Sequence, residues 1–469
     1  MIPFLFQLAL FFLPFTSIAG LPFLGESQHE LSAHVFLLLL VLSVLPVLFY
    51  FRQAGDPVRT DRKIYALPQI MMIVMGVIAL SFLPNVTSIT SSVFMGRTGL
   101  EKYISSTILV LFGFSIAFLT YFVATLKSWD KLIVNPIAAS VIVCAFFSFF
   151  EMIMRWTGGM SGVFHALASL VYSSEFPVLE WDPRLRSVAF EPPDFANTAG
   201  YMWPWVLSAV MFSRGAKRIA FAAIWLVLSG MILLSEARTS LVVIAGLVSV
   251  FLVLWFFLLP KVASRDPDKM LAPVIIVTLI AFPLILALLV LYYDQLIYNV
   301  IVGDRVSNLT RLASMTAAFR MFAEQPIFGF GFGQYAFHIK EFMPSWGYYS
   351  WEIRYWLMNE AGGWPASFSV YARFAADMGL LGLVMWVGVW LWLAWQLLTQ
   401  TMIYRKLTGE LPFPAYPLIM SCFCVLLAGV PCDSVRSPMI WVNMGLACRY
   451  LYDTRKHIRS IINPSQATV

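Results

Sequence analysis

A turn between two apolar runs contains an arginine with a carboxylate beside it. Arg238 and Glu236 lie in the segment Ser235–Ser240, between runs that end at Leu234 and begin at Leu241. A charged group at the boundary of a membrane-spanning run is costly, so by default it is a functional residue with an anionic partner. An anionic substrate and a purely structural ion pair with Glu236 are the two interpretations of Arg238.

A second segment combines two arginines with a run of glycines. Arg311 and Arg320 lie in a stretch with apolar residues at three-to-four spacing, which predicts a helix that ends before Pro326. Arg311 falls in the first turn of this helix, and Arg320 falls on another face. The glycines over 329–333 follow no strand, which argues against a nucleotide-binding loop. They are expected to turn the chain tightly back toward the membrane.

A third segment places two arginines before a glutamate. Arg184 and Arg186 precede Glu191, which is followed by two prolines over 192–193. Guanidinium groups bind phosphate oxygens bidentately and keep their proton. Glu191 is a candidate general base, because a sugar hydroxyl that attacks another sugar must lose a proton and apolar surroundings raise a carboxyl pKa. A solvated ion pair between Arg186 and Glu191 is the alternative.

The stretch between Tyr335 and Trp364 is rich in aromatic residues. Flat amphipathic rings pack on sugar faces, and they also form the interfacial belt of any membrane protein. Tyr335 is a candidate for substrate binding on the first interpretation. His338 lies among the rings and is a second candidate, because an imidazole can exchange a proton near neutral pH.

The elements that must position these residues are membrane helices. Of 469 residues, 60% are hydrophobic and 12% are charged, and this composition excludes a soluble enzyme, a disordered chain and a DNA-binding domain. The five cysteines form no CxxC motif and have no histidine at ligand spacing, so neither a metal site nor a disulfide framework is expected. Apolar runs predict an all-α integral membrane protein of about twelve transmembrane helices. The predicted spans are 3–20, 34–51, 64–83, 103–125, 132–154, 197–213, 219–235, 240–259, 271–292, 374–399, 413–430 and 438–452.

The distribution of basic residues predicts the orientation of a single polytopic domain over 1–469. Of the 31 Lys and Arg residues, 18 fall in short loops that the positive-inside rule assigns to the cytoplasm, together with both termini. Two long segments, 155–196 and 293–373, then lie outside, the second between the ninth and tenth helices. The 13 basic residues outside comprise eleven Arg and two Lys. This bias favours binding of an anionic group at the outer membrane face, with a chance bias in composition as the alternative.

Three motifs in one order carry a resemblance to a known family. They are the turn Ser-x-x-Arg-Thr-Ser-Leu over 235–241, Arg311-Leu followed by Gln-Pro-Ile-Phe-Gly-Phe-Gly over 325–331, and Asp-Met-Gly-Leu-Leu-Gly over 377–382. This order resembles the O-antigen ligase/polymerase superfamily of bacterial envelope glycosyltransferases, most closely over 220–400.

The resemblance implies a multi-pass enzyme of the bacterial inner membrane with a GT-C-like architecture. Such an enzyme acts at the periplasmic face on undecaprenyl-diphosphate-linked oligosaccharides, with no cofactor and no nucleic acid. By the same resemblance, Arg238 and Arg311 hold the lipid diphosphate, and two fixed guanidinium groups would stabilise the charge of that leaving group. Membrane lipids are further expected partners, and a chain-length-regulating membrane protein is an open possibility.

One departure and one likeness favour one branch of the superfamily. Ligases that transfer glycan to lipid A core carry His-Asn where this chain has Phe368-Ser369. The Phe-Glu-Pro-x-x-Phe-Ala segment over 190–196 resembles a stretch common in polymerases of the Wzy type. The sequence therefore predicts an O-antigen or surface polysaccharide polymerase with Glu191, Arg238 and Arg311 as catalytic residues.

The remaining candidates are assigned to substrate binding: Arg184, Arg186, Arg320, Tyr335 and His338. Two alternatives to a polymerase stay open. The first is an O-antigen ligase or a protein O-oligosaccharyltransferase. The second is a flippase or exporter of lipid-linked glycan, which would bind the diphosphate without breaking a bond.

Overall fold

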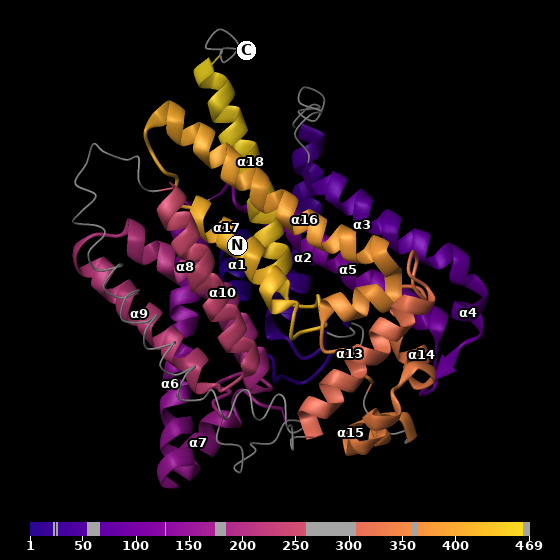
Figure 1. Ribbon diagram of the computed structural model, residues 1–469. Helices are drawn as coiled ribbons and strands as arrows, with labels where there is room; N and C mark the ends of the chain where they lie inside the picture. The colour runs from indigo at the N-terminus through magenta and orange to yellow at the C-terminus, as the bar shows by residue number, and fades with distance from the viewer. Residues whose placement is uncertain are drawn as a thin grey trace.

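The computed structural model describes residues 1–21, 24, 27–53, 66–126, 128–173, 184–258, 306–358 and 364–462. The described part is helical apart from one antiparallel hairpin, β1 (Val93–Phe94) with β2 (Arg97–Thr98) (Figure 1). The α-helices are α1 (Ile2–Phe11), α2 (Leu31–Gln53), α3 (Ala66–Phe82), α4 (Val86–Ser91), α5 (Gly99–Val123), α6 (Asn135–Thr157), α7 (Ser161–Ala168), α8 (Pro192–Phe212), α9 (Gly215–Leu234), α10 (Arg238–Leu258), α13 (Val306–Glu324), α14 (Tyr335–Phe342), α15 (Trp351–Met358), α16 (Val370–Thr408), α17 (Ala415–Ala428) and α18 (Pro438–Ile462).

The multi-pass membrane character expected from the sequence is supported by the helices. Within the described ranges, five segments are long and apolar enough to cross a membrane: Ala66–Ser91, Gly99–Val123, Asp130–Thr157, Gly215–Leu234 and Val370–Thr408. Four further apolar helical stretches among the described residues are Ile2–Phe11, Leu31–Ser43 within α2, Val242–Leu254 within α10, and Ala415–Ala428. The all-α fold is thus confirmed, while twelve spans and a GT-C-like architecture stay predictions.

The predicted spans coincide with helices, with two exceptions. The span 271–292 lies outside the described residues. The first span, expected over 3–20, is only the ten-residue helix α1, which ends at Phe11. Pro14 lies three residues after Phe11. Because the residue before a proline is held away from helical geometry, the apolar run continues without helical structure.

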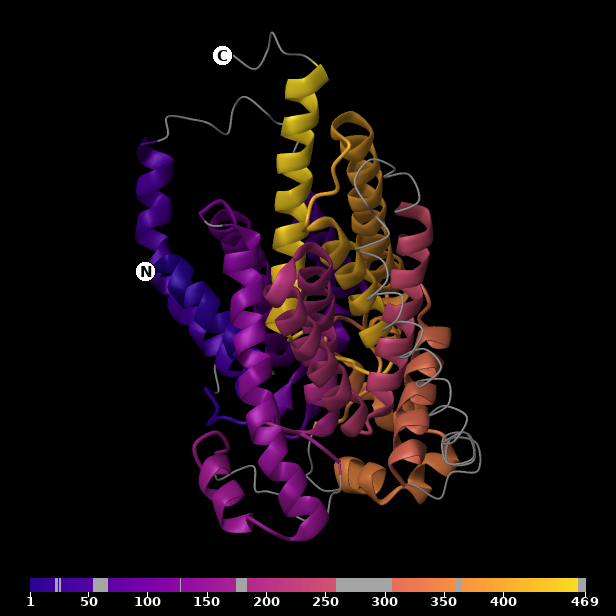
Figure 2. The same cartoon turned by 90° about the vertical axis from the view of Figure 1, so that its left-hand side faces the viewer.

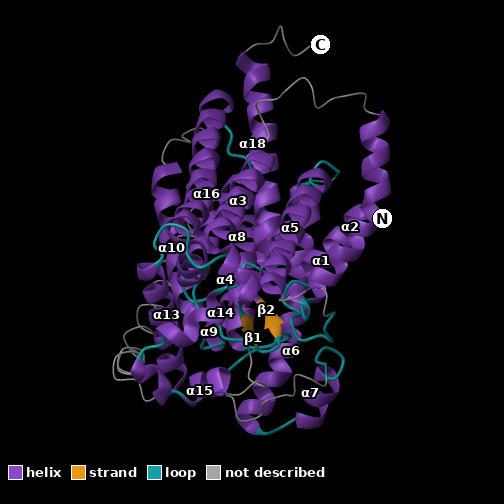
Figure 3. Cartoon of the chain, turned by 90° about the vertical axis from the view of Figure 1, so that its right-hand side faces the viewer, coloured by secondary structure: helices purple, strands orange, loops and turns teal. Residues whose placement is uncertain are grey.

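The loop-rich end of the bundle carries the elements around the candidate residues. Figures 2 and 3 show the C-terminus at one end of the bundle and α7 at the other, and Figure 3 shows α15 at the same end as α7, on the opposite side. The described parts of the two predicted outer segments are partly helical, because they contain α7, α13, α14 and α15. Helix α8, which leaves this end, is buried along most of its length. A residue at the start of α8 is therefore held by the core.

The glycine-rich motif and the start of α16 dock against each other through their backbones. Phe330 N–H donates to the Ala376 carbonyl at 2.9 Å, and Leu380 N–H donates to the Pro326 carbonyl at 2.7 Å. Gly379 interrupts the helical geometry of α16 with φ 62° and ψ −151°. A Cβ at Gly379 would lie 2.5 Å from the Ile327 carbonyl carbon, so only glycine allows this contact. The predicted tight turn at 329–333 is confirmed by positive φ angles at its three glycines.

Candidate active site

The loop before α8 is fixed by one buried carboxylate. Glu151 on α6 is fully buried and accepts hydrogen bonds from the Arg155 guanidinium at 2.7 Å and from the Ser187 backbone N–H at 2.8 Å. The Arg186 N–H donates to it as well, at 3.4 Å. An ionised carboxylate needs such donors when it is buried. Because its donors come from the loop, Glu151 fixes the backbone that carries Arg184 and Glu191.

Other contacts hold the same loop against distant segments. The Phe190 N–H donates to Thr16 Oγ1 at 2.9 Å, and Leu185 N–H donates to the Leu234 carbonyl at 3.1 Å. Leu234 ends α9 immediately before the turn that contains Arg238. The two charged segments of the sequence, at 184–191 and 235–240, are therefore neighbours in the structure.

Glu191 occupies the N-cap position of α8, among charged side chains from three parts of the chain. It retains exposed surface, but nearby protein atoms partly desolvate its carboxylate, and this desolvation is the main reason that its pKa is raised. The Asp194 carboxylate also raises the pKa, whereas Arg311, Arg184 and Arg436 lower it. The structure thus brings Glu191, Arg184 and Arg311 together, and a carboxylate with a raised pKa is suited to accept a proton.

Arg311 is a half-buried cation on α13. Burial is the main influence on its pKa and lowers it, while the Glu191 and Glu352 carboxylates raise it. Its guanidinium lies over the ring of Phe368, 5.0 Å from the centroid. A planar guanidinium stacks well on an aromatic face. The ring of Phe368 therefore orients Arg311 toward the start of α8.

The turn that presents Phe368 is built on Asp433. The Asp433 carboxylate accepts from the backbone N–H groups of Ser367 at 2.7 Å and Phe368 at 3.2 Å. Phe368 itself has a positive φ of 57°. This is a rare conformation for a residue with a Cβ, and Asp433 maintains it. Phe368 and Ser369 are the positions where ligases carry His-Asn, so the site has an apolar ring where those enzymes have an imidazole.

Arg436 is a cation of the site that the motif analysis did not single out. Its guanidinium bridges two carboxylates, with Nε 3.1 Å from Glu30 and Nη2 3.2 Å from Asp194. The only signal in the sequence was its membership of the Arg-rich outer set. Its contact with Asp194, three residues after Glu191, could not be foreseen because the two arginine-bearing segments are over 200 residues apart.

Arg238 can be placed only through its backbone. It is the first residue of α10, directly after a turn in which Glu236 has a positive φ of 46°. Its side chain lies outside the described part of the structure. The predicted pairing of Arg238 with an anionic ligand therefore stays a prediction, supported by the position of the turn beside Leu185.

Two other predicted binding residues contact the backbone or an aromatic ring. Arg186 is buried against the Tyr172 ring and donates to the Phe190 carbonyl at 3.2 Å, so it stabilises the loop. Arg320 donates to the Phe342 carbonyl at 3.3 Å, nine residues further along α13 than Arg311. Their proposed role in substrate binding stays untested.

Tyr335 and His338 belong to α14. The buried Tyr335 hydroxyl donates to the Ser314 carbonyl at 2.9 Å. His338 Nε2 lies 3.3 Å from Ser88 Oγ, and burial lowers the pKa of its imidazole. A lowered pKa keeps His338 neutral at pH 7. Neither side chain is shown beside Glu191, although Tyr335 lines the cavity described next.

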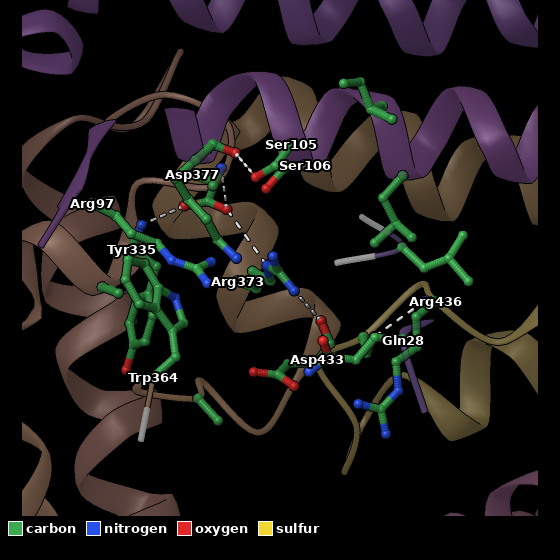
Figure 4. A pocket seen from close by; sticks show the side chains of 18 of the residues that line it. Gln28, Arg97, Ser105, Ser106, Tyr335, Trp364, Arg373, Asp377, Asp433 and Arg436 are labelled. Atoms are coloured by element: carbon green, nitrogen blue, oxygen red, sulfur yellow. Dashed lines mark hydrogen bonds and ion pairs between the residues drawn. The ribbon is translucent and has the colours of Figure 1, made fainter. Parts of the chain in front are cut away.

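Arg436 also lines a cavity of about 930 Å³. Basic side chains around it outnumber acidic ones by four to two: Arg97, Lys102, Arg373 and Arg436 against Asp377 and Asp433. Figure 4 shows Arg373 between the two carboxylates and Arg97 beside Trp364. The sequence analysis missed this cavity, because its residues come from five separate stretches.

Comparison with known proteins gives a match to one family. No curated protein matches the chain. Residues 222–387 match the family model described as O-antigen ligase, a range that includes Arg238, Arg311, Phe368 and Gly379 and excludes Glu191. This match confirms the resemblance of the chain to the O-antigen ligase/polymerase superfamily of membrane enzymes.

Proposed function

We propose that the protein is a polymerase that joins undecaprenyl-diphosphate-linked oligosaccharide repeat units at the periplasmic face of the inner membrane. The observation that carries the proposal is the convergence of three charged side chains. Glu191 is at the N-cap of α8, Arg184 is in the loop before it, and Arg311 is on α13. The site combines a proton acceptor with cations suited to a diphosphate.

The reaction follows from these groups. The Glu191 carboxylate removes the proton from an acceptor sugar hydroxyl, and the hydroxyl oxygen attacks the anomeric carbon of the donor sugar. The bond from that carbon to the diphosphate oxygen breaks, and the electron pair leaves with the diphosphate. Arg311 and Arg184 stabilise the charge that develops on this leaving group, with Arg238 as the third proposed cation.

The environment of Glu191 agrees with a base that is active when the donor is bound. In the free protein, Arg311 and Arg184 lower the pKa of Glu191 and oppose the effect of desolvation. A bound diphosphate would neutralise these cations and add negative charge nearby. The pKa of Glu191 would then rise further, which strengthens the base at the moment it is needed.

The packing of Phe368 favours a polymerase over a ligase. A phenyl ring cannot exchange a proton, and it lies under Arg311, where ligases of the superfamily have an imidazole nearby. Glu191, whose pKa is raised by desolvation, is then the proposed base. A ligase stays the alternative, because the matching family model carries that description.

Purified full-length protein tests the proposal when it is incubated with a synthetic undecaprenyl-diphosphate-linked repeat unit. We expect chain growth with the wild type, and loss of chain growth with retained donor binding for Glu191→Gln. Glu410→Gln is the matched control, because Glu410 is exposed directly after α16. Donor translocation across vesicles without chain growth would instead identify an exporter.

A deletion strain separates polymerase from ligase. Loss of a polymerase leaves single repeat units on the carrier or on core. Full-length polymer that accumulates on undecaprenyl diphosphate and never reaches core would show that the protein is a ligase, and the proposal would be wrong.

A further inference from the structure

We propose that the 930 Å³ cavity binds the diphosphate headgroup and first sugars of a second lipid-linked glycan, separate from the donor at Glu191. As the site of the acceptor substrate, this assignment rests on the proposed polymerase function. The cavity has a cationic end, an aromatic face and an apolar wall, and each part matches one part of such a lipid.

The cationic end is suited to phosphate because its two carboxylates already have partners from the protein. Asp377 accepts from the backbone N–H groups of Gly333 at 2.9 Å and Tyr335 at 2.8 Å, and Arg373 lies 3.7 Å away. Asp433 accepts from the turn at Ser367. Arg436 is balanced by Glu30 and Asp194, and Arg373 by Asp377. The cationic end of the cavity is therefore formed by Arg97 and Lys102, whose charged N–H groups suit a phosphate.

The aromatic face is an indole in a cluster with two phenyl rings, which also pack on each other at 6.3 Å. Trp364 packs edge-on against Phe94 at 5.6 Å and Phe337 at 5.5 Å. Lys102 Nζ lies 5.0 Å and the Arg97 guanidinium 5.9 Å from the indole centroid. A fixed indole with two cations beside it can hold a sugar ring next to a phosphate.

Arg97 and Lys102 are held in place by the hairpin before α5 and by the capped start of α5. The hairpin β1–β2 carries Arg97 on its second strand, and Thr98 caps α5 by accepting from the Glu101 N–H at 3.2 Å. Lys102 is in the first turn of α5 and is 7% exposed. Their spacing therefore depends on a capped helix rather than on a loose loop.

The apolar wall continues from the cationic end along a candidate membrane span. Ile108, Leu109 and Phe112 of α5 line the cavity, together with Leu37 of α2. Ile108 is 54% exposed, as expected for a side chain that faces lipid. A polyprenyl chain can lie along this wall while its headgroup reaches Lys102, whereas a soluble anion would use only the cationic end.

Arg436 connects the cavity with the proposed donor site. It lines the cavity and is paired with Asp194 beside Glu191. The end of the cavity at Arg436 therefore faces the charged residues at the start of α8. This adjacency is what an acceptor requires.

Native mass spectrometry of the full-length protein in phosphatidylcholine nanodiscs tests the proposal, with undecaprenyl diphosphate as the probe. We expect two bound molecules per wild-type chain. The double variant Arg97→Gln/Lys102→Gln should weaken one of them by about tenfold or more, the factor for one lost charge-assisted hydrogen bond. Lys340→Gln, an exposed lysine on α14, is the control and should keep both.

A second variant leaves the cations intact. Ile108→Trp places a large side chain on the exposed apolar wall, and it should also remove one bound lipid while Arg311→Gln removes the other. A single bound molecule in the wild type, or two molecules in both cavity variants, would overturn the proposal. Equal displacement of the second molecule by phosphatidylglycerol would overturn it too, because the cavity would then be a general phospholipid site.

Failure of this site and failure of the polymerase function are distinguishable. One bound lipid with normal chain growth would contradict the cavity assignment alone. Two bound lipids without chain growth would contradict the polymerase assignment and leave the binding site intact.

Discussion

Arg311 has two features that a lysine cannot reproduce. Its guanidinium lies over the ring of Phe368, 5.0 Å from the centroid, and its planar fork can bind two phosphate oxygens at once. Arg311→Lys keeps the charge but loses both, so we expect chain growth to fall by about 10²-fold, the effect of removing one donor to a developing oxyanion. Arg238→Lys should behave alike. Initial rates of polymer formation at equal protein level measure the loss.

Arg354→Lys is the matched control for these variants. Arg354 is an exposed arginine on α15 whose guanidinium donates to the Tyr348 carbonyl at 2.8 Å. Its replacement should change the rate little. Rates close to wild type for both Arg311→Lys and Arg238→Lys would remove the diphosphate role from these residues.

The raised pKa of Glu191 predicts the acid side of the pH profile. The base must be ionised, so chain growth is lost as pH falls through this pKa, which desolvation and Asp194 hold above the ordinary glutamate value. Because Arg184 lowers the pKa, Arg184→Gln should move the acid limb to higher pH. The pH dependence of kcat/KM, which reports the pKa values of the free protein, measures both effects. An acid limb below the ordinary glutamate value would contradict the role of Glu191 as base.

At the scale of elements, the start of α16 depends on one glycine. Gly379 combines a positive φ with a backbone contact to the segment before Gly329. Gly379→Ala should destabilise the protein by at least about 1–3 kcal/mol, the strain of a side chain in this conformation, with a further penalty for displaced backbone. A lower unfolding temperature in detergent would show it.

Gly388 provides the comparison within the same helix. A Cβ there meets nothing within 4 Å, and its φ is ordinary. Gly388→Ala should therefore leave the unfolding temperature unchanged or raise it, because alanine is the better helix former. Equal effects of the two substitutions would show that the docking of 326–331 on α16 does not hold this end of the molecule.

At the scale of the whole molecule, the orientation in the membrane decides which substrates can reach Glu191. The candidate site lies toward the end of the bundle with α7 and α15, and the C-terminus lies at the other end (Figure 3). Exposed positions at the two ends are Tyr349, 77% exposed, and Ile462, 60% exposed. In spheroplasts, a membrane-impermeant maleimide should label Tyr349→Cys, and should label Ile462→Cys only after permeabilisation. The reverse pattern would contradict the predicted topology.

The sequence by itself determined the features that depend on neighbours along the chain. Apolar runs identified the helices, except where Pro14 ends α1 early. The glycines over 329–333 indicated a tight turn, and the order of motifs indicated a resemblance to the superfamily, which the match over 222–387 supports. Each of these signals is local, because helix formation and turn geometry follow from adjacent side chains.

Only the tertiary structure decided which charged residues share a site. Arg311 lies close to Glu191 and over Phe368, whereas Arg320 on the same helix contacts the backbone near α14. The cavity that Arg436 lines likewise depends on stretches from Leu24 to Arg436. Spacing along the chain cannot show these groupings, because the packing of the helices sets the distances between segments. Contacts such as the one between Glu151 and the Ser187 N–H fix that packing.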